Sequence, residues 1–278
     1  MRPPIEELLD SFYKKEIERI QKLREAPKLL ILSDQSIPQN VIYTKQKLKK
    51  SLDIGINCTI VNIANMNDDD VKHLILKEKD SGIILQLPAP SINHTNDLIN
   101  FIGPERDIDG LTTYNTGCVM EGKEPYFYPC TAKGVIWLLN QMNEQIEGKN
   151  VVVIGRSNLV GRPLSSMFLN CNATITTLHS KTINPIVHTS KADIIVSAIG
   201  IPHHWDEFIL GKTRPIVIDV GISRNNEGKI VGDCDIESME PFCKWITPVP
   251  GGMGKITVAM LMDNVITFQE KLENNESN

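Results

Sequence analysis

The chain has 278 residues, and its most constraining feature is the alternation of short apolar runs with helical patterns. In the first half, the apolar runs at 29–32, 59–64 and 83–87 predict strands. The more polar segments at 38–54 and 68–79 lie between these runs and predict helices. Strands joined through helices are typical of a parallel sheet.

A second series of apolar runs follows, at 151–154, 174–178, 194–198 and 216–220. These runs are again separated by helical or turn-rich segments, so a second parallel sheet is predicted. The sequence therefore predicts an α/β protein with two α/β domains, the second of them a Rossmann-like parallel sheet.

The segment 115–129 is rich in Gly, Pro, Tyr and charge, and we expect the chain to cross between the domains there, near residue 125. The apolar spacing within 5–23 predicts an amphipathic helix. We expect one domain to comprise residues 1–125 with a C-terminal helix at about 256–278, and the other to comprise 126–255.

Charge and cysteine usage exclude several classes of protein. With 34 acidic and 29 basic residues the net charge is -5, so no overall positive field would attract nucleic acid or a membrane surface. The six cysteines are scattered and predict neither a zinc ribbon nor a disulfide framework, and we expect no metal. The first residues lack the apolar run of a signal peptide, so a cytoplasmic protein is expected.

A glycine-containing loop, Gly155-Arg156-Ser157-Asn158-Leu159-Val160-Gly161, directly follows the predicted strand at 151–154. A strand, a glycine loop and a helix N-terminus together present backbone N–H groups to a dinucleotide pyrophosphate. The spacing departs from G-x-G-x-x-G, because Ser157 stands where the second glycine would be. A glycine turn that binds no ligand is the alternative.

The next strand bears on the choice of cofactor. An NAD-binding unit normally places an acidic residue there for the ribose 2′-hydroxyl, but 173–181 contains none. Ser180 and Lys181 follow that strand, and Arg156 lies in the preceding loop, so a 2′-phosphate is favoured and NADP is expected rather than NAD. The alternative is that both cations are solvated loop residues.

Tyr43 and Lys47 are four residues apart in the predicted helix at 38–54, on one helix face. Helical periodicity assigns Val41, Leu48 and Leu52 to the core and Tyr43 and Lys47 to the opposite side, where they could serve proton transfer. Neighbouring lysines make a solvated lysine face the alternative.

Two further motifs stand in the same half of the chain. Gln86-Leu87-Pro88 ends an apolar strand, where open α/β sheets bind ligands. Asp107-Ile108-Asp109-Gly110 has two aspartates, but a turn closed by glycine explains it more simply than a metal site does.

In order, these motifs closely resemble the methylenetetrahydrofolate dehydrogenase/cyclohydrolase family over about residues 43–264. The set is Tyr43 with Lys47, Gln86-Leu87-Pro88, Asp107-Ile108-Asp109-Gly110, Pro129-Cys130-Thr131, the loop 155–161, His179-Ser180-Lys181-Thr182 and the segment 247–252. The resemblance implies NADP-dependent oxidation of 5,10-methylenetetrahydrofolate to the methenyl form, followed by hydrolysis to 10-formyltetrahydrofolate. It also implies a homodimer in which each subunit joins a folate-binding catalytic domain to an NADP-binding domain, with the two ligands meeting in a cleft between them.

Carried over residue by residue, the resemblance makes Lys47 the catalytic lysine, with Tyr43 ordering the folate, Gln86 holding Lys47 and Asp109 gripping the pterin. The remaining folate contacts would come from Leu85, Leu87, Pro250, Gly251, Gly252 and Gly254. The NADP contacts would come from Thr131, Gly155, Arg156, Ser157, Ser180 and Ile222.

One departure concerns Lys255, which replaces a proline that the family usually has beside the folate. Its cation could reach the anionic glutamate tail of the substrate.

Three alternatives stay open at this point. They are a dehydrogenase with little cyclohydrolase activity, a catalytically silent dinucleotide-binding protein, and an NADP-dependent reductase of a small carbonyl compound.

Overall fold

The computed structural model describes residues 1–211 and 213–276, which form two compact units. Unit 1 comprises Met1–Leu9, Val119–Lys123 and Thr131–Thr257, and unit 2 comprises Asp10–Cys118, Glu124–Cys130 and the residues from Val258 onward. The last two residues of the expected C-terminal helix lie outside the described residues.

The first nine residues differ from the expected division, because they belong to unit 1 rather than to unit 2. The cause is local: Ile246 N donates to the carbonyl of Met1 at 3.2 Å, and the Arg2 guanidinium binds Glu240 at 2.8 Å.

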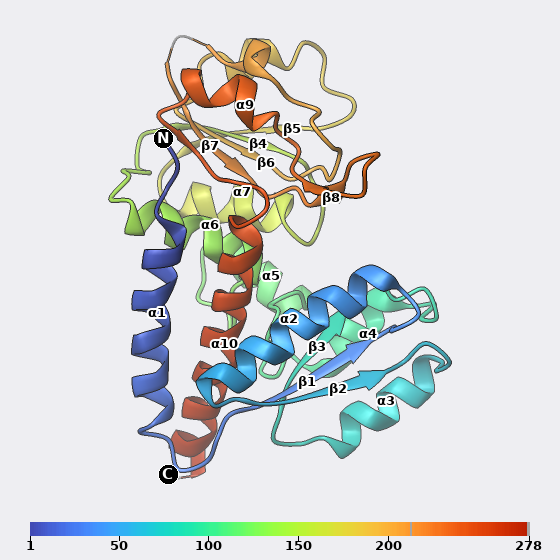
Figure 1. The fold of residues 1–278 in the computed structure, drawn as a ribbon. Helices are drawn as coiled ribbons and strands as arrows, with labels where there is room; N and C mark the ends of the chain where they lie inside the picture. The colour runs from blue at the N-terminus through green and yellow to red at the C-terminus, as the bar shows by residue number, and fades with distance from the viewer. Residues whose placement is uncertain (212, 277–278) are drawn as a thin grey trace. The chain divides into compact units, whose positions relative to one another are not determined.

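Unit 2 contains a three-stranded parallel sheet in the order β2-β1-β3 (Figure 1). Its elements are β1 (Lys28–Ser33), α2 (Pro38–Ile54), β2 (Asn57–Asn62), α3 (Asp68–Lys77), β3 (Gly82–Gln86) and α4 (Thr95–Ile102). Four helices contribute residues to both units: α1 (Ile5–Ile20), α5 (Thr113–Met120), α6 (Cys130–Gln141) and α10 (Met253–Glu276).

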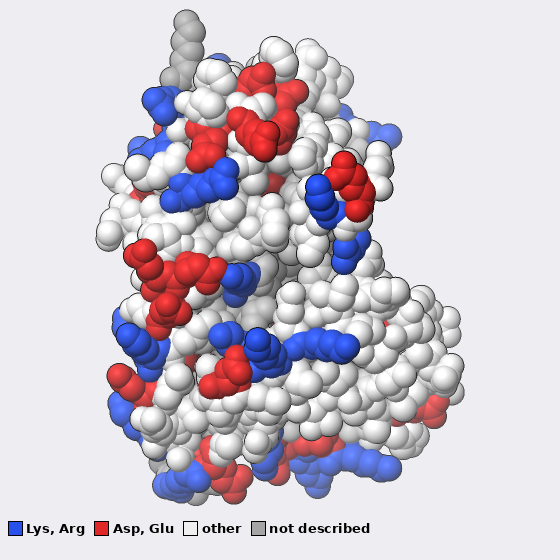
Figure 2. All heavy atoms as spheres, in the orientation of Figure 1, with Lys and Arg blue, Asp and Glu red and all other residues white. Residues whose placement is uncertain are grey.

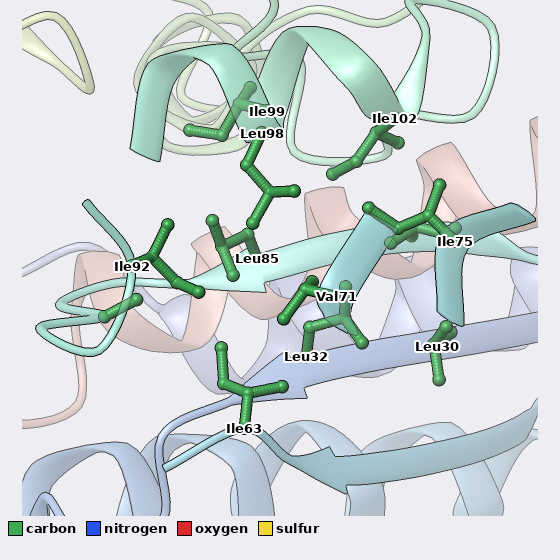
Figure 3. Packing of buried hydrophobic residues seen from close by; sticks show 12 residues of the cluster. Leu30, Leu32, Ile63, Val71, Ile75, Leu85, Ile92, Leu98, Ile99 and Ile102 are labelled. Atoms are coloured by element: carbon green, nitrogen blue, oxygen red, sulfur yellow. The ribbon is translucent and has the colours of Figure 1, made fainter. Parts of the chain in front are cut away.

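One face of this sheet is covered by α3 and α4, and Figure 3 shows the apolar side chains that pack there. Leu30 and Leu32 of β1 and Leu85 of β3 face Val71 of α3 and Leu98 of α4. Figure 1 shows α2 on the opposite face. Strands β1 and β3 are therefore buried on both faces, and ligands can reach the sheet at the strand ends.

Two details of unit 2 differ from the sequence expectation. The second strand begins at Asn57, two residues early, because α2 ends at Gly55 in a left-handed conformation with φ 94° and Asn57 pairs with Lys28. The expected crossing contains the helix α5, which starts where the Thr112 hydroxyl accepts a hydrogen bond from Asn115 N at 3.3 Å.

Unit 1 contains a five-stranded parallel sheet in the order β10-β7-β6-β4-β5. Its central elements are β4 (Asn150–Ile154), α7 (Gly161–Asn170), β5 (Thr174–Leu178), α8 (Ile186–Thr189), β6 (Ile194–Ser197), β7 (Ile216–Asp219), α9 (Ile236–Met239) and β10 (Trp245–Ile246). Smaller elements are the 3-10 turns η1 (Glu207–Ile209) and η2 (Glu240–Phe242) and the two-stranded pair β8 (Ser223–Arg224) and β9 (Ile230–Val231). The two parallel sheets with their helices confirm the expected α/β class.

The strand order of unit 1 reverses beside β4, because the chain runs from β4 to β5 on one side and then to β6 on the other. Such a switch point leaves a crevice at the carboxyl ends of the strands. The loops that follow β4 and β6 meet there: a Cβ atom on Gly155 would come within 2.5 Å of the carbonyl oxygen of Ala198.

The charged residues carry both signs on the face of the molecule drawn in Figure 2, where Lys and Arg are interspersed with Asp and Glu. Among the described residues, no helix is long and apolar enough to cross a membrane.

Candidate functional site

The helix α2 of unit 2 buries a polar face. Its buried residues are Asn40, Thr44, Ser51 and Ile54, and the spacing places Lys47 on the same stripe. The prediction that Leu52 belongs to the core is wrong, because its side chain is 60% exposed. Periodicity of apolar residues misassigned this helix because hydrogen-bonding side chains occupy its inner face.

Lys47 lies against the end of strand β3. Its Nζ donates to Oε1 of Gln86 at 2.9 Å, and Nε2 of Gln86 donates to the carbonyl of Leu87 at 2.9 Å. The amide of Gln86 is thereby oriented with its oxygen toward the lysine. Lys47 is half-buried, whereas Lys45 and Lys49 on the same helix are exposed.

Asn40 anchors the start of the helix to the same strand end, and the sequence reasoning missed it. Its Nδ2 donates to the carbonyl of Asp34 at 3.0 Å and to the carbonyl of Pro88 at 2.9 Å. Asn40 thus ties the segment after β1 to the segment after β3. Its spacing of seven residues from Lys47 was the signal that could have revealed it.

The other predicted residues near this strand end occupy different environments. Tyr43 is half-buried on α2, one turn before Lys47. Leu85 is buried in the apolar cluster of unit 2, and Leu87 packs against that cluster. The backbone of these two leucines is therefore what a ligand at the strand end would meet.

The segment from Asp107 to Gly110 lies beside β3, where Asp107 forms a parallel bridge with Ile83. Oδ2 of Asp107 accepts hydrogen bonds from Thr112 N at 2.6 Å and from Asn115 Nδ2 at 3.1 Å. Burial raises the pKa of Asp107 to about 6, and the Asp109 carboxylate contributes to the rise. The two aspartates therefore differ in role: Asp107 is buried and structural, and Asp109 is half-buried.

Gly110 is required at the end of this turn. Its φ is 72°, and a Cβ atom there would lie 2.7 Å or less from backbone atoms of Phe127, Tyr128 and Pro129. Only glycine fits such a position without strain.

In unit 1, the loop that follows β4 has the form that a dinucleotide requires. Gly155 has a φ of 125° and packs against Ala198, as described above. The Ser157 hydroxyl accepts hydrogen bonds from Val160 N at 3.2 Å and Gly161 N at 3.5 Å, so it caps the start of α7 and its own O–H can still act as a donor. This loop and helix N-terminus fit an anionic pyrophosphate.

The turn that follows β5 is ordered by its own side chains. The Thr182 hydroxyl accepts a hydrogen bond from His179 N at 2.9 Å, and Nδ1 of His179 accepts one from Lys181 N at 3.2 Å. Ser180 is exposed in this turn. Arg156 is exposed in the loop after the neighbouring strand β4, so its guanidinium is free to meet an anion at this edge.

The glycine-rich segment 250–254 leads into α10. Gly251 has a φ of 98°, and a Cβ atom on Gly254 would lie 3.3 Å from Cδ1 of Ile222. Pro250 is exposed, whereas Gly252 is buried. Nearby along the same helix, Thr257 Oγ1 donates to Thr131 Oγ1 at 3.4 Å.

Lys255 forms an ion pair with Glu6 of α1. Both side chains are more than half exposed. The cation that replaces the family proline therefore has a partner within its own unit.

Sequence reasoning also missed two buried carboxylates in unit 1, Asp219 at the end of β7 and Asp233 after β9. Burial raises the pKa of Asp219 to about 7, with a further contribution from the Asp233 carboxylate. The available signal was an acidic residue at the end of an otherwise apolar strand. Among the described residues, no group of three or more His, Cys, Asp or Glu side chains is arranged to hold a metal ion.

The fold and these residues define a two-unit α/β enzyme with a dinucleotide-binding unit and a separate unit that carries a lysine at a strand end. Residues 4–109 match the catalytic domain of the tetrahydrofolate dehydrogenase/cyclohydrolase family, and residues 129–273 match its NAD(P)-binding domain. The chain belongs to this family, and the resemblance noted in its motifs is confirmed.

Individual relatives agree with this assignment. The chain is 41% identical over 259 residues to the bifunctional protein FolD of Rickettsia canadensis, which covers 91% of this chain and 90% of the relative. It superposes with a TM-score of 0.91 on the crystal structure of the bifunctional FolD methylenetetrahydrofolate dehydrogenase/cyclohydrolase from Campylobacter jejuni, at 34% identity over 95% of this chain and 96% of the other. The Trypanosoma brucei dehydrogenase-cyclohydrolase, solved with NADP and an inhibitor, gives a TM-score of 0.89 at 28% identity, with 96% of each chain covered.

Proposed function

We propose that this enzyme oxidises 5,10-methylenetetrahydrofolate to 5,10-methenyltetrahydrofolate with NADP and then hydrolyses the methenyl product to 10-formyltetrahydrofolate. The single observation that carries the proposal is the hydrogen bond of 2.9 Å between Lys47 Nζ and Gln86 Oε1. It places an amine on the buried face of α2 at the carboxyl end of β3, where α/β sheets bind ligands.

For the oxidation, the protein has mainly to hold the substrate. Hydride departure from the methylene carbon leaves a cation that two adjacent nitrogens stabilise, so positioning is the main requirement. Tyr43 on α2 would order the folate ring, and Asp109 would accept hydrogen bonds from the pterin. The backbone around Gln86 would line the same strand end.

For the hydrolysis, a proton has to move. Water adds to the methenyl carbon of the cationic substrate and a C–N bond of the ring opens, so the attacking water loses both of its protons: the released nitrogen takes up one, and the other leaves to solvent. Nζ of Lys47 is the group that we assign to this proton transfer. Gln86 would hold that nitrogen in place, because its amide oxygen already accepts a hydrogen bond from it.

On the cofactor side, NADP supplies the hydride acceptor when it is bound. The backbone of Gly155 and the hydroxyl of Ser157 would hold its pyrophosphate. Arg156 and Ser180 would bind the 2′-phosphate. Further contacts would come from Thr131 and Ile222, and Pro250, Gly251, Gly252 and Gly254 would border the folate.

The test is Lys47→Met, which keeps the length of the side chain and removes its nitrogen. General acid or base groups typically contribute ~10² to 10⁴-fold, so cyclohydrolase turnover should fall by about that factor. Dehydrogenase activity should fall less, because positioning by Tyr43 and Gln86 is retained.

Lys45→Met and Lys49→Met are matched controls, since both lysines are exposed on the same helix. Each should leave both activities near those of the unmodified enzyme. If all three variants behaved alike, Lys47 would be a solvated surface lysine. If the unmodified enzyme oxidised the methylene substrate but did not hydrolyse the methenyl product, the dehydrogenase-only alternative would replace the proposal.

The homodimer and the cytoplasmic location are proposals that come from the family resemblance and the sequence. Light scattering coupled to size-exclusion chromatography would test the first, with twice the mass of the 31.1 kDa chain expected. Cell fractionation would test the second.

A further inference from the structure

Two buried carboxylates in unit 1 connect the loops that follow strands β6 and β7. Asp233 lies between β9 and α9, and it accepts hydrogen bonds from Ile199 N at 2.8 Å and from Ile201 N at 2.9 Å, both in the loop after β6. It also accepts one from the Ser197 hydroxyl at 2.8 Å, at the end of β6 itself. One side chain therefore determines the course of the chain from Ser197 to Ile201.

Asp219 organises the neighbouring strand end in the same way. Its Oδ1 accepts hydrogen bonds from Gly221 N at 2.9 Å and from Asp233 N at 3.1 Å, and its Oδ2 accepts one from Cys234 N at 2.8 Å. The turn after β7 is thus joined to the segment that carries Asp233.

Two glycines allow the carboxylates to approach the backbone this closely. A Cβ atom on Gly221 would collide with the carboxylate of Asp233, and a Cβ atom on Gly232 would collide with that of Asp219. Both aspartates have a relative exposure of 0%. Burying two carboxylates side by side is unfavourable unless backbone donors satisfy them, so the arrangement serves to fix the backbone.

The loop that Asp233 holds lies at the switch point of the sheet. Ala198, at the start of that loop, is the residue against which Gly155 packs. The turn after β7 leads directly to Ile222. Both segments therefore stand at the carboxyl ends of strands beside the glycine loop, where an α/β sheet receives a dinucleotide.

We propose that Asp219 and Asp233 are positioning residues for the cofactor, which hold the loops after β6 and β7 in the conformation that NADP requires before it binds. The inference rests on the proposed NADP site. We expect neither carboxylate to contact the cofactor. Their effect is transmitted through the backbone of Ile199, Ile201 and Gly221.

Asp233→Asn is the informative variant, because an amide has only one acceptor oxygen. That oxygen can replace Oδ2 and keep the hydrogen bonds from Ser197 and Ile199, but the amide nitrogen then faces Ile201 N, and that bond is lost. The matched control is Ser197→Ala, which removes a hydrogen bond to the same carboxylate and leaves both loop amides bound to it. We expect both variants to lower the thermal stability of the protein, because each loses a buried hydrogen bond.

The measurement is calorimetric titration of each full-length variant with NADP, together with the KM for folate. We expect Asp233→Asn to weaken NADP binding by about tenfold or more, with the KM for folate unchanged, and Ser197→Ala to leave NADP binding unchanged. Equal NADP affinity in Asp233→Asn and the unmodified protein would overturn the proposal. An equal loss in both variants would also overturn it, because general loosening of the unit would then explain the result.

A second measurement needs no variant and holds even if Asp233→Asn fails to fold. Backbone amide exchange in the unmodified protein should show Ile199, Ile201 and Gly221 protected without NADP. Protection that appeared only after NADP was added would overturn the proposal. Failure of the unmodified protein to bind NADP at all is a different result, which would refute the proposed cofactor itself and remove the basis of this inference.

Discussion

The buried carboxyl group of Asp107 makes the stability of unit 2 depend on pH in a direction opposite to that of a surface carboxylate. Its pKa is raised from 3.8 to about 6, chiefly by burial. A group whose pKa is higher in the folded protein holds its proton more tightly there. Its stabilising contribution to the free energy of unfolding is therefore fully present below pH ~4 and is lost as the pH rises through about 6. The full difference of about two pKa units corresponds to ~3 kcal/mol.

The perturbation that isolates this effect is Asp107→Asn. The hydrogen bonds from Thr112 N and from Asn115 Nδ2 both go to the single oxygen Oδ2, and one amide oxygen can accept both. The variant therefore removes the ionisable group and retains its bonds. Asp219, whose pKa is also raised, titrates equally in both proteins and cancels in the comparison.

The assay is urea unfolding of both proteins at a series of pH values. Between about pH 4.5 and about pH 8 the variant should gain ~2 kcal/mol of unfolding free energy relative to the unmodified protein. The remainder of the ~3 kcal/mol is lost below about pH 4.5, where the unfolded chain already ionises. A difference that did not change with pH would refute the reasoning, as would one in which the unmodified protein gained stability with rising pH.

Three further predictions concern the cofactor site, the aspartate turn and the departure at residue 255. Arg156→Ala should lower the affinity for NADP by about 10- to 150-fold in a titration, since charge-assisted hydrogen bonds are worth ~1.5 to 3 kcal/mol, and should lower the affinity for NAD much less. An equal loss of affinity for both cofactors would contradict this. Gly110→Ala should destabilise the protein by more than ~2 kcal/mol in urea unfolding, because the φ of residue 110 is 72° and a Cβ atom there would collide with the backbone of Tyr128. An unchanged free energy of unfolding would contradict this, because the turn would then relax without cost. Lys255→Met and Glu6→Gln should each change the free energy of unfolding by no more than ~1 kcal/mol, because the ion pair is exposed. Both variants should leave the KM for folate unchanged. A raised KM in Lys255→Met alone would show that the lysine reaches the substrate instead.

The sequence predicted the strands of both sheets well, because most of them are buried and appear as short apolar runs. The run at 174–178 coincides with β5, and the run at 83–87 differs from β3 by one residue at each end. The glycine loop after β4 was equally visible, since close backbone approach requires its glycines, which the sequence shows directly. The fold class followed from these features alone.

The buried face of α2 could not be predicted by the same means. Its inner positions carry Asn40, Thr44 and Ser51, whose polar side chains are satisfied by hydrogen bonds. The Thr44 and Ser51 hydroxyls donate to carbonyls one turn earlier in the helix, whereas other bonds reach groups distant in sequence. Asn40, for example, donates to the carbonyl of Pro88, 48 residues away. Apolar periodicity therefore assigned Leu52 to the core and Lys47 to the opposite side, although the family motif named Lys47 as the catalytic candidate.

The two carboxylates of unit 1 escaped prediction for a related reason. Asp219 and Asp233 are 14 residues apart in the chain, and their shared role appears only when the loops after β6 and β7 are seen in space. Burial of an acidic residue also contradicts its usual place at the surface. Only the donors around each carboxylate explain its position.

The central claim is that one chain carries out both the oxidation and the hydrolysis, and the most direct test combines them. The purified protein is mixed with 5,10-methylenetetrahydrofolate and NADP while NADPH and 10-formyltetrahydrofolate are followed together, and a parallel sample receives the methenyl substrate without NADP. We expect NADPH to form only when the folate is present, and 10-formyltetrahydrofolate to appear in both samples faster than without protein. Formation of NADPH without release of the formyl product above the uncatalysed rate, or no folate-dependent NADPH at all, would contradict the claim.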